Sequence, residues 1–207
     1  MDFLSLQHSP VNWLDLLVVI VIMLGVRKGR MNGMSVELVP MLQWMCIVAA
    51  GALLYRPMGD WLAEVSPMGH LFCYIGMYIV IAILVKGVFS LIKKGAGGKL
   101  TGSDLFGRAE FYLAMGAGAI RFLCILLAGM ALLNAPYYSQ KEIASNLAYQ
   151  QDMYGSDFFP GLSNVQIQVF KESFIGSFIK KQAPFLLIES TKSEPSKGLQ
   201  RRKDELP

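Results

Sequence analysis

The sequence has few charges, few histidines and few cysteines, and each shortage excludes a class of protein. Only 16% of its 207 residues are charged, against 54% that are hydrophobic, which is too little charge for an average soluble domain. The two histidines, His8 and His70, stand apart, so we expect no metal site. The three cysteines lie inside apolar runs without a C-x-x-C spacing, which argues against a disulfide framework and against a zinc or redox motif.

Cations are also missing ahead of the first apolar run. The residues before Val11 include Asp2 and His8 but neither Lys nor Arg, whereas a cleavable signal peptide carries cations in front of its apolar core. We therefore expect the first run to be retained as a membrane anchor. The formal net charge of +4 does not indicate a nucleic-acid partner, because the cations lie where membrane topology would place them.

Long apolar runs take the place of charge in this sequence. There are four of them: Val11–Val26, Met34–Tyr55, Met68–Ile92 and Ala109–Ala135. The last three reach the ~20 residues that a helix needs to cross a bilayer core. The first does so only if it continues to about residue 30 while its cations reach toward the headgroups; a shallow or re-entrant first element is the alternative. The sequence thus predicts an all-α polytopic protein with four transmembrane helices and the lipid bilayer as its partner.

Lysines and arginines gather in two of the links between these runs. Arg27, Lys28 and Arg30 lie between the first two runs, and the link at 93–108 between the last two runs is also basic. Short loops rich in Lys and Arg stay in the cytoplasm. We therefore predict that both basic links are cytoplasmic and that both termini are extracytoplasmic.

The chain after residue 135 is more polar. Residues 136–188 predict an extracytoplasmic helical tail, with a first helix opened by Ser139 and a second capped by Ser163 or Asn164. The second helix has one apolar face, made of Ile167, Phe170, Phe174 and Phe178. This face lies in the lipid interface, or it packs on the helix bundle or on a second copy. Residues 189–207 are rich in Ser, Lys and Glu and predict disorder.

Four ionisable residues lie within the apolar runs: Asp15, Glu37, Lys86 and Arg121. Each costs ~2.5–3.5 kcal/mol near the centre of a spanning helix, so each should find a partner or water. The predicted orientation places Asp15 and Arg121 toward the outer side, and Glu37 and Lys86 near the inner side. We predict an outer ion pair of Asp15 with Arg121, and an inner group of Glu37 with Lys86 or the cations at 27–30.

Small residues recur at four-residue spacing. Gly25, Gly29 and Gly33 share one face of any helix that continues through them, and Ala114 and Gly118 do so in the fourth run. Small residues at this spacing let helix backbones approach closely in lipid. We therefore expect tight helix contacts at these residues and a possible homo-oligomer.

Motifs for catalysis and cofactor binding are missing. In the link at 93–108, Gly98-Lys99 is followed by Leu100 rather than Ser or Thr, and an apolar helix rather than a strand precedes it, so this is no P-loop. Since no nucleophile–base set and no metal-ligand cluster occur in the spans, we expect no catalytic, cofactor-binding or metal-binding residue and no enzymatic activity.

Several of these residues together resemble the opening of a known membrane-protein family. Trp13-Leu14-Asp15, the three glycines and Glu37 look like the start of the colicin V production proteins, which are multi-span proteins of the bacterial inner membrane. The stretches Leu100–Asp104 and Gly118–Arg121 are similar to two later segments of that family. Two positions depart from its pattern: Ala114 and Phe122 each stand where a glycine is common.

The resemblance implies a function that the residues alone do not. It implies an inner-membrane protein that supports production or secretion of a peptide toxin, or envelope maintenance, as an interaction component with an envelope or secretion protein as partner. The alternative from the residues themselves is a small channel or transporter with a polar path around Asp15 and Arg121.

Overall fold

The computed structural model describes residues 13–96, 109–139 and 162–192, and these residues are helical apart from links and one isolated parallel bridge. Four long helices come first: α1 (Trp13–Asn32), α2 (Met34–Val65), α3 (His70–Ala96) and α4 (Glu110–Asn134). Four short elements follow: α6 (Leu162–Ile167), the π-helix η4 (Gln168–Glu172), α7 (Phe174–Gln182) and the 3-10 turn η5 (Pro184–Leu186). The all-α prediction is confirmed for the part of the chain that the structure describes.

The chain divides into two compact units, and α1 contributes to both. One unit combines residues up to Val19 with Tyr137–Pro184, and the other combines Ile20–Pro136 with the residues from Phe185 onward. This division differs from the predicted boundary at residue 135, because the first turns of α1 group with the tail and the end of the chain groups with the long helices.

Three helices are long and apolar enough to cross a membrane: Met34–Val65, His70–Gly95 and Glu110–Asn134. Many of their large apolar side chains are exposed; Leu53, Phe72 and Leu91 are 74%, 62% and 69% exposed. Exposed apolar surface on this scale is costly in water and favourable against lipid tails. The chain is therefore a membrane protein. Helix α1, which carries three cations in its second half, is not among these three helices.

A single residue, Gly33, separates α1 from α2. Its φ is +75°, a region that side chains with a Cβ rarely adopt, so glycine is needed at this turn. Gly33 therefore ends the helix, and the predicted face of Gly25, Gly29 and Gly33 does not continue beyond it.

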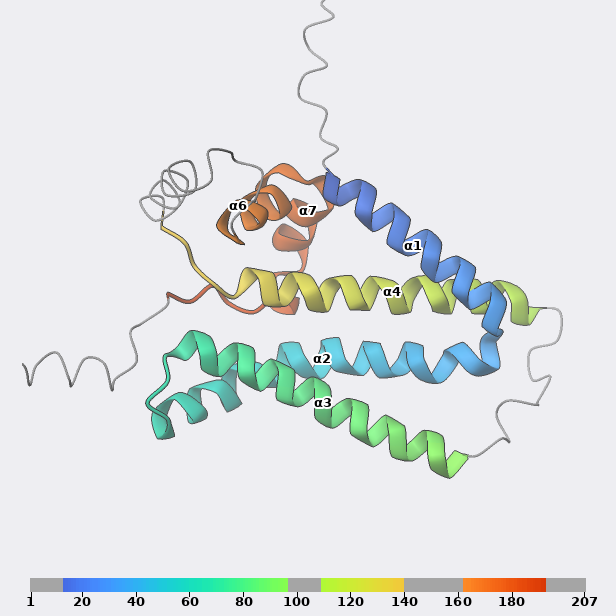
Figure 1. Ribbon diagram of the computed structural model, residues 1–207, viewed down its shortest axis with the longest axis horizontal. Coiled ribbons are helices and arrows are strands. Elements are labelled where there is room, and N and C mark those ends of the chain that lie inside the picture. Colours follow the sequence, from blue (N-terminus) through green and yellow to red (C-terminus); the bar gives the residue numbers. More distant parts are fainter. Residues whose placement is uncertain (1–12, 97–108, 140–161, 193–207) are drawn as a thin grey trace, which may run out of the picture. The chain divides into compact units, whose positions relative to one another are not determined.

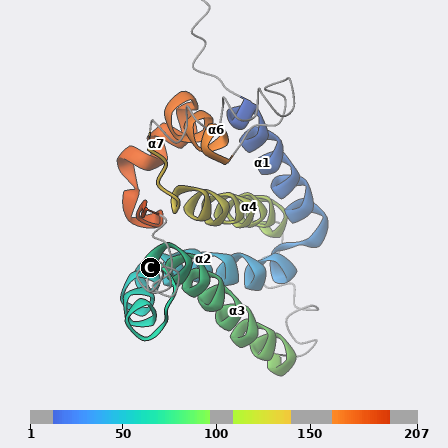
Figure 2. The ribbon, with the colours of Figure 1, turned by 60° about the vertical axis from the view of Figure 1, so that its left-hand side comes forward.

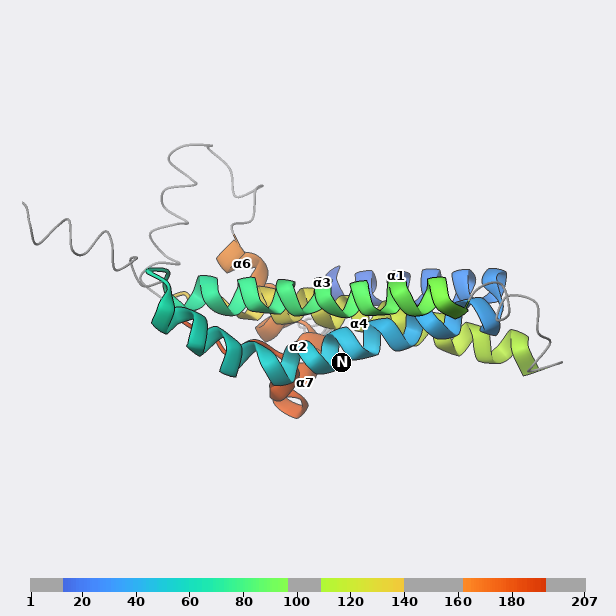
Figure 3. The same ribbon diagram turned by 90° about the horizontal axis from the view of Figure 1, so that it is seen from below.

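Helix α2 is longer than the predicted run that ended at Tyr55. It continues through Pro57 to Val65, so most of the predicted link between the second and third spans is helical. Proline removes one backbone donor from a helix, and membrane helices tolerate this where neighbouring groups compensate. Figure 3 shows α2 bent along its length.

Within the second unit, α2 lies between α3 and α4 and packs against both (Figures 1 and 2). Helices α2 and α4 run in the same direction and α3 runs in the opposite one, as Figure 1 shows. Gly51 and Gly59 of α2 lie against the rings of Tyr78 and Tyr74 of α3, where an added Cβ would collide with the ring atoms. These glycines thus make room for two aromatic rings at the α2–α3 contact.

The segment after η5 is bound to the ends of α2 and α4. Asn134 donates from Nδ2 to the Ile188 carbonyl oxygen at 2.9 Å, and the Glu189 amide donates to Tyr55 Oη at 3.1 Å. Glu189 also pairs with Arg56 at 3.2 Å. The stretch predicted to be disordered from residue 189 therefore begins in ordered contacts; residues 193–207 lie outside the described part.

The tail helices differ from the predicted single helix with one apolar face. The helix breaks at Ser173, whose backbone is extended and whose side chain caps α7 by accepting from the Gly176 amide. Phe170, before the break, is buried, whereas Phe174 and Phe178 after it are exposed and stacked with ring centroids 6.5 Å apart. The helix predicted to begin at Ser139 lies largely outside the described residues.

Candidate functional site

A buried ion pair joins α2 to α4 inside the second unit. The guanidinium of Arg121 donates from Nη1 to Glu37 Oε1 at 2.7 Å, and the Glu37 side chain is fully buried. Charge-assisted hydrogen bonds of this length are the strong ones, and a buried carboxylate without such a partner is very costly. Arg121 and Glu37 therefore satisfy each other within the helix bundle.

The second oxygen of Glu37 is also bound. Asn32, the last residue of α1, donates from Nδ2 to Glu37 Oε2 at 2.9 Å, so the carboxylate links three helices. Nearby, Glu110 at the start of α4 accepts from the Ser35 hydroxyl at 3.1 Å, so a second carboxylate joins α4 to the beginning of α2. Each contact crosses between helices and fixes their relative rotation.

The second half of α1 packs on the first half of α4 through small residues. A Cβ added to Gly25 would lie 2.7 Å from the Gly118 carbonyl oxygen, and one added to Gly29 would collide with the Ala114 carbonyl oxygen. At the same contact, the Arg30 guanidinium lies over the ring of Phe111, 4.8 Å from its centroid. The predicted packing residues other than Gly33 thus meet one another within a single chain. The homo-oligomer stays a prediction.

The ionisable residues are combined differently from the predicted pairs. Arg121 binds Glu37 instead of Asp15, and the oxygens of Glu37 are taken by Arg121 and Asn32 instead of Lys86 or the cations at 27–30. The predicted pairing placed Arg121 toward the outer side, near Asp15. The long Arg121 side chain instead reaches along α4 to an acid in the first turn of α2.

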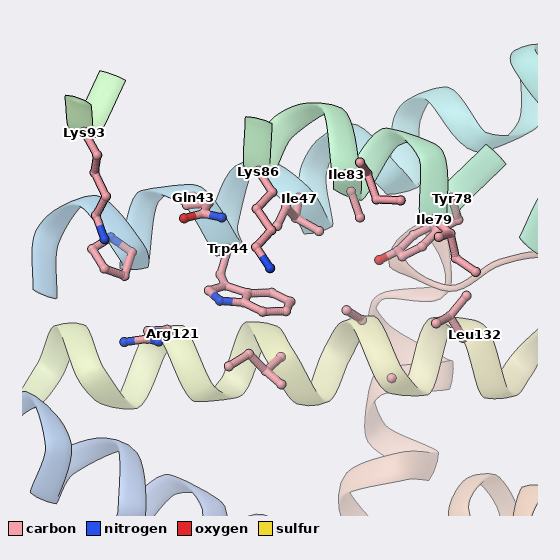
Figure 4. A pocket seen from close by; sticks show the side chains of 15 residues that line it. Gln43, Trp44, Ile47, Tyr78, Ile79, Ile83, Lys86, Lys93, Arg121 and Leu132 are labelled. Carbon is pink, nitrogen blue, oxygen red and sulfur yellow. The ribbon is translucent and has the colours of Figure 1, made fainter. Parts of the chain in front are cut away.

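A groove runs along α2 between α3 and α4, with a volume of about 560 Å³. It is lined by one face of each helix, because the lining residues recur at intervals of three and four. Five of them are polar: Gln43, Tyr78, Lys86, Lys93 and Arg121. Figure 4 shows Lys86 and Trp44 pointing into the space between α3 and α4. We call this space the α2–α3–α4 groove.

Two polar atoms at the α2–α3–α4 groove are buried without a partner. Among the described residues, neither Tyr78 Oη nor Arg121 Nε has a hydrogen-bond partner. The Tyr78 side chain is only 2% exposed, and its hydroxyl points into the groove in Figure 4. Buried polar groups in proteins are almost always bonded, so these two donors need an explanation.

In the first unit, Asp15 binds the N-terminus of a tail helix. Its Oδ1 accepts from the Ser173 hydroxyl at 2.7 Å and from the Ile175 amide at 3.0 Å, and its Oδ2 accepts from the Phe174 amide at 3.2 Å. The first amides of a helix have no partner inside the helix and attract a negative charge. Asp15 thus holds α7 by the end that favours a carboxylate.

We expect Asp15→Ala to loosen the start of α7. Three charge-assisted hydrogen bonds are lost, and at ~1.5–3 kcal/mol for a bond to a charged group the exchange of the Phe174 and Ile175 amides should be about 10–100-fold faster. Hydrogen exchange followed by mass spectrometry measures this. The control is Lys181→Ala, which shortens an exposed side chain in the last turn of the same helix and should leave those amides unchanged. Equal exchange in Asp15→Ala and wild type would contradict the role of Asp15.

The described residues contain no group of three or more His, Cys, Asp or Glu side chains that could hold a metal ion. In the same part of the chain, Glu37, Arg121 and Glu110 make helix-to-helix contacts. Lys86 and Lys93 line the α2–α3–α4 groove. The site thus fixes helices against one another and presents cations in the groove.

Sequence reasoning missed three partners at these sites: Asn32, Ser35 and Ser173. For Ser173 a signal existed, because serine is a preferred N-cap residue, but the second tail helix was predicted to run from Ile167 to Phe178 without a break. Glu110, an acid in the first turn of a helix, was also a recognisable signal. Asn32 and Ser35 carry no distinguishing pattern and became visible only through the fold.

Comparison with known proteins gives one match. The family model of the colicin V production protein matches residues 14–167, which include all of α2, α3 and α4 and all but the first residue of α1. No curated protein and no solved structure matches the chain.

Proposed function

This chain belongs to the colicin V production protein family, and we propose that it supports toxin secretion as a non-enzymatic, multi-pass protein of the bacterial inner membrane. Membership in the family supports a role in toxin production, and the three apolar helices support a membrane location. Secretion, the inner membrane and the absence of turnover are the parts that we propose.

The observation that carries this proposal is the use of the ionisable residues in helix contacts. Glu37 and Arg121 bind each other, Glu110 binds Ser35, and Asp15 binds the start of α7. A general acid or base needs a side chain free to exchange a proton with a substrate. These residues instead hold the helices in one arrangement, as expected for a protein whose role is to bind an envelope or secretion partner.

The test removes this chain from bacteria that make and export colicin V. We expect a smaller zone of killing around the colonies and normal toxin inside the cells. The wild-type chain should restore the killing zone. Toxin measured separately in cells and medium distinguishes secretion from synthesis. An unchanged killing zone would contradict any role in toxin production, and toxin lost from both compartments would contradict the secretion role.

We propose further that α1 is a fourth span and that both termini are extracytoplasmic. The packing of Gly25 and Gly29 on α4 supports a membrane-embedded α1. The Arg56–Glu189 pair supports the orientation, because it joins the segment after the fourth helix to the link that is predicted to face outward.

Cysteine labelling tests this orientation. In a chain whose three native cysteines are replaced by alanine, Arg56→Cys should react with a membrane-impermeant thiol reagent in intact spheroplasts. Lys94→Cys should react only after the membrane is permeabilised, because Lys93 and Lys94 end α3 on the cytoplasmic side. Labelling of both positions in the same compartment would contradict the proposed topology.

A small channel or transporter is the second candidate function. The observation that favours it is the α2–α3–α4 groove, where Gln43, Lys86 and Arg121 introduce polar groups between apolar helices. Flux of anions and protons into liposomes that contain the purified chain tests it. Flux that Arg121→Gln reduces would support a transport path, and no flux in the wild type would exclude this function.

A further inference from the structure

We propose that the α2–α3–α4 groove binds an anionic phospholipid. The phosphate of the lipid binds to Lys86 and Lys93, and an acyl chain lies on the aliphatic part of the groove. This goes beyond the proposed secretion role and requires only that α2, α3 and α4 lie in a membrane.

The charge of the groove is the first argument. Three cations line it, and of these Arg121 is bound to Glu37. Within the described part of the chain, no carboxylate forms an ion pair with Lys86 or Lys93. Two lysines on one helix face, seven residues apart, thus offer positive charge that no described carboxylate neutralises. Basic pockets between membrane helices recognise anionic headgroups.

The buried donors are the second and independent argument. Tyr78 is only 2% exposed, yet its hydroxyl points into the groove without a partner among the described residues. Arg121 Nε is likewise buried and unpaired. A lipid supplies the missing acceptors, because its ester carbonyls can accept from Tyr78 and its phosphate oxygens from Arg121.

The shape and polarity of the groove fit a molecule with two kinds of end. Its charged side chains lie toward the end of α3 at Lys93. Toward the opposite end the aliphatic side chains of Ile79, Ile83 and Leu132 gather beside Tyr78 (Figure 4). A volume of about 560 Å³ holds a headgroup and part of one acyl chain, and the rest of the lipid continues into the bilayer. A small inorganic anion would leave the aliphatic end empty.

The experiment uses the fluorescence of Trp44, which lines the groove. The other two tryptophans, Trp13 and Trp61, are replaced by phenylalanine in the full chain. The protein is placed in vesicles of unlabelled phosphatidylcholine, to which a lipid with brominated acyl chains is added. The added lipid is either phosphatidylglycerol or phosphatidylcholine. Bromine quenches a tryptophan that it contacts. We expect the anionic lipid to quench Trp44 at an about tenfold lower mole fraction than the zwitterionic one, since each lysine near lipid phosphate adds attraction.

The control variants separate the groove from general surface charge. Lys86→Gln with Lys93→Gln should abolish the preference, whereas Lys94→Gln, the same change at the neighbouring residue outside the groove, should preserve it. Equal quenching by both lipids in the otherwise wild-type protein would overturn the proposal without any lysine variant. Loss of the preference in Lys94→Gln would overturn the proposal as well, because general surface charge would then explain the preference for the anionic lipid.

Two further measurements identify the occupant. Inorganic phosphate should leave the quenching by phosphatidylglycerol unchanged; displacement of the lipid by phosphate would overturn the lipid assignment. Tyr78→Phe keeps the ring and removes the donor, so both lipids should need an about threefold higher mole fraction. An unchanged requirement would overturn the assigned contact between the Tyr78 hydroxyl and the ester.

Discussion

Arg121→Leu is expected to destabilise the protein by about 3–5 kcal/mol, because it leaves the Glu37 carboxylate buried without a counter-ion. The carboxylate would keep only the Asn32 amide as a partner. Unfolding of the purified protein in mixed micelles of increasing SDS content measures the change. Arg27→Leu is the control: Arg27 is exposed on α1, and its replacement should change stability by less than ~0.5 kcal/mol.

The double variant distinguishes a missing partner from a missing side chain. Glu37→Leu combined with Arg121→Leu removes both charges, and it should recover most of the stability that either single variant loses. If Arg121→Leu alone costs less than ~1 kcal/mol, the range of solvated surface pairs, the ion pair is not buried in the membrane as described.

Gly118→Leu is expected to separate α1 from α4 and destabilise the chain by at least the ~1–3 kcal/mol typical of overpacking. A Cβ at this position would collide with the Gly25 carbonyl oxygen. Because the collision is with backbone, no rotamer change can relieve it, and the two helices must move apart. The same SDS unfolding measurement applies, together with Gly118→Ala, which should give a smaller loss of the same sign.

Gly116→Ala is the matched control for this contact. Gly116 lies two residues away on the same helix, and nothing lies within 4 Å of a Cβ added there. Alanine is the better helix former by ~0.5–1 kcal/mol, so this variant should be slightly stabilised. A stabilising effect at Gly118, or equal effects at both glycines, would contradict the close α1–α4 approach.

The helices could be predicted from the sequence because the signal for them is local. A run of apolar residues of spanning length can be recognised without knowing which helices pack around it. The breaks at Gly33 and before Glu110 follow local composition. The end of α2 was harder to predict, because a proline usually ends a helix. Here α2 continues for eight residues beyond Pro57, to Val65. Whether a proline is tolerated depends on the groups around it, which the sequence does not specify.

Only part of the candidate site could be predicted from the sequence, because the sequence does not specify which groups surround a residue. Asp15, Glu37, Lys86 and Arg121 stand out as ionisable residues in apolar runs, so their identity could be read directly. Their partners could not, because pairing depends on helix rotation and on how far each side chain extends. Among the described residues, Asp15 binds the start of a helix about 160 residues later, and no charge pattern points to that contact.

The three hydrogen bonds at Asp15 have a consequence for biosynthesis. The donors at Ser173, Phe174 and Ile175 leave the ribosome more than 150 residues after the carboxylate that accepts them. During translation, the beginning of α1 must therefore wait for these donors until almost the entire chain has been made. A nascent chain stalled before Ser173 would hold all four long helices and still lack this closure, so the beginning of α1 becomes fixed only after those helices have been made.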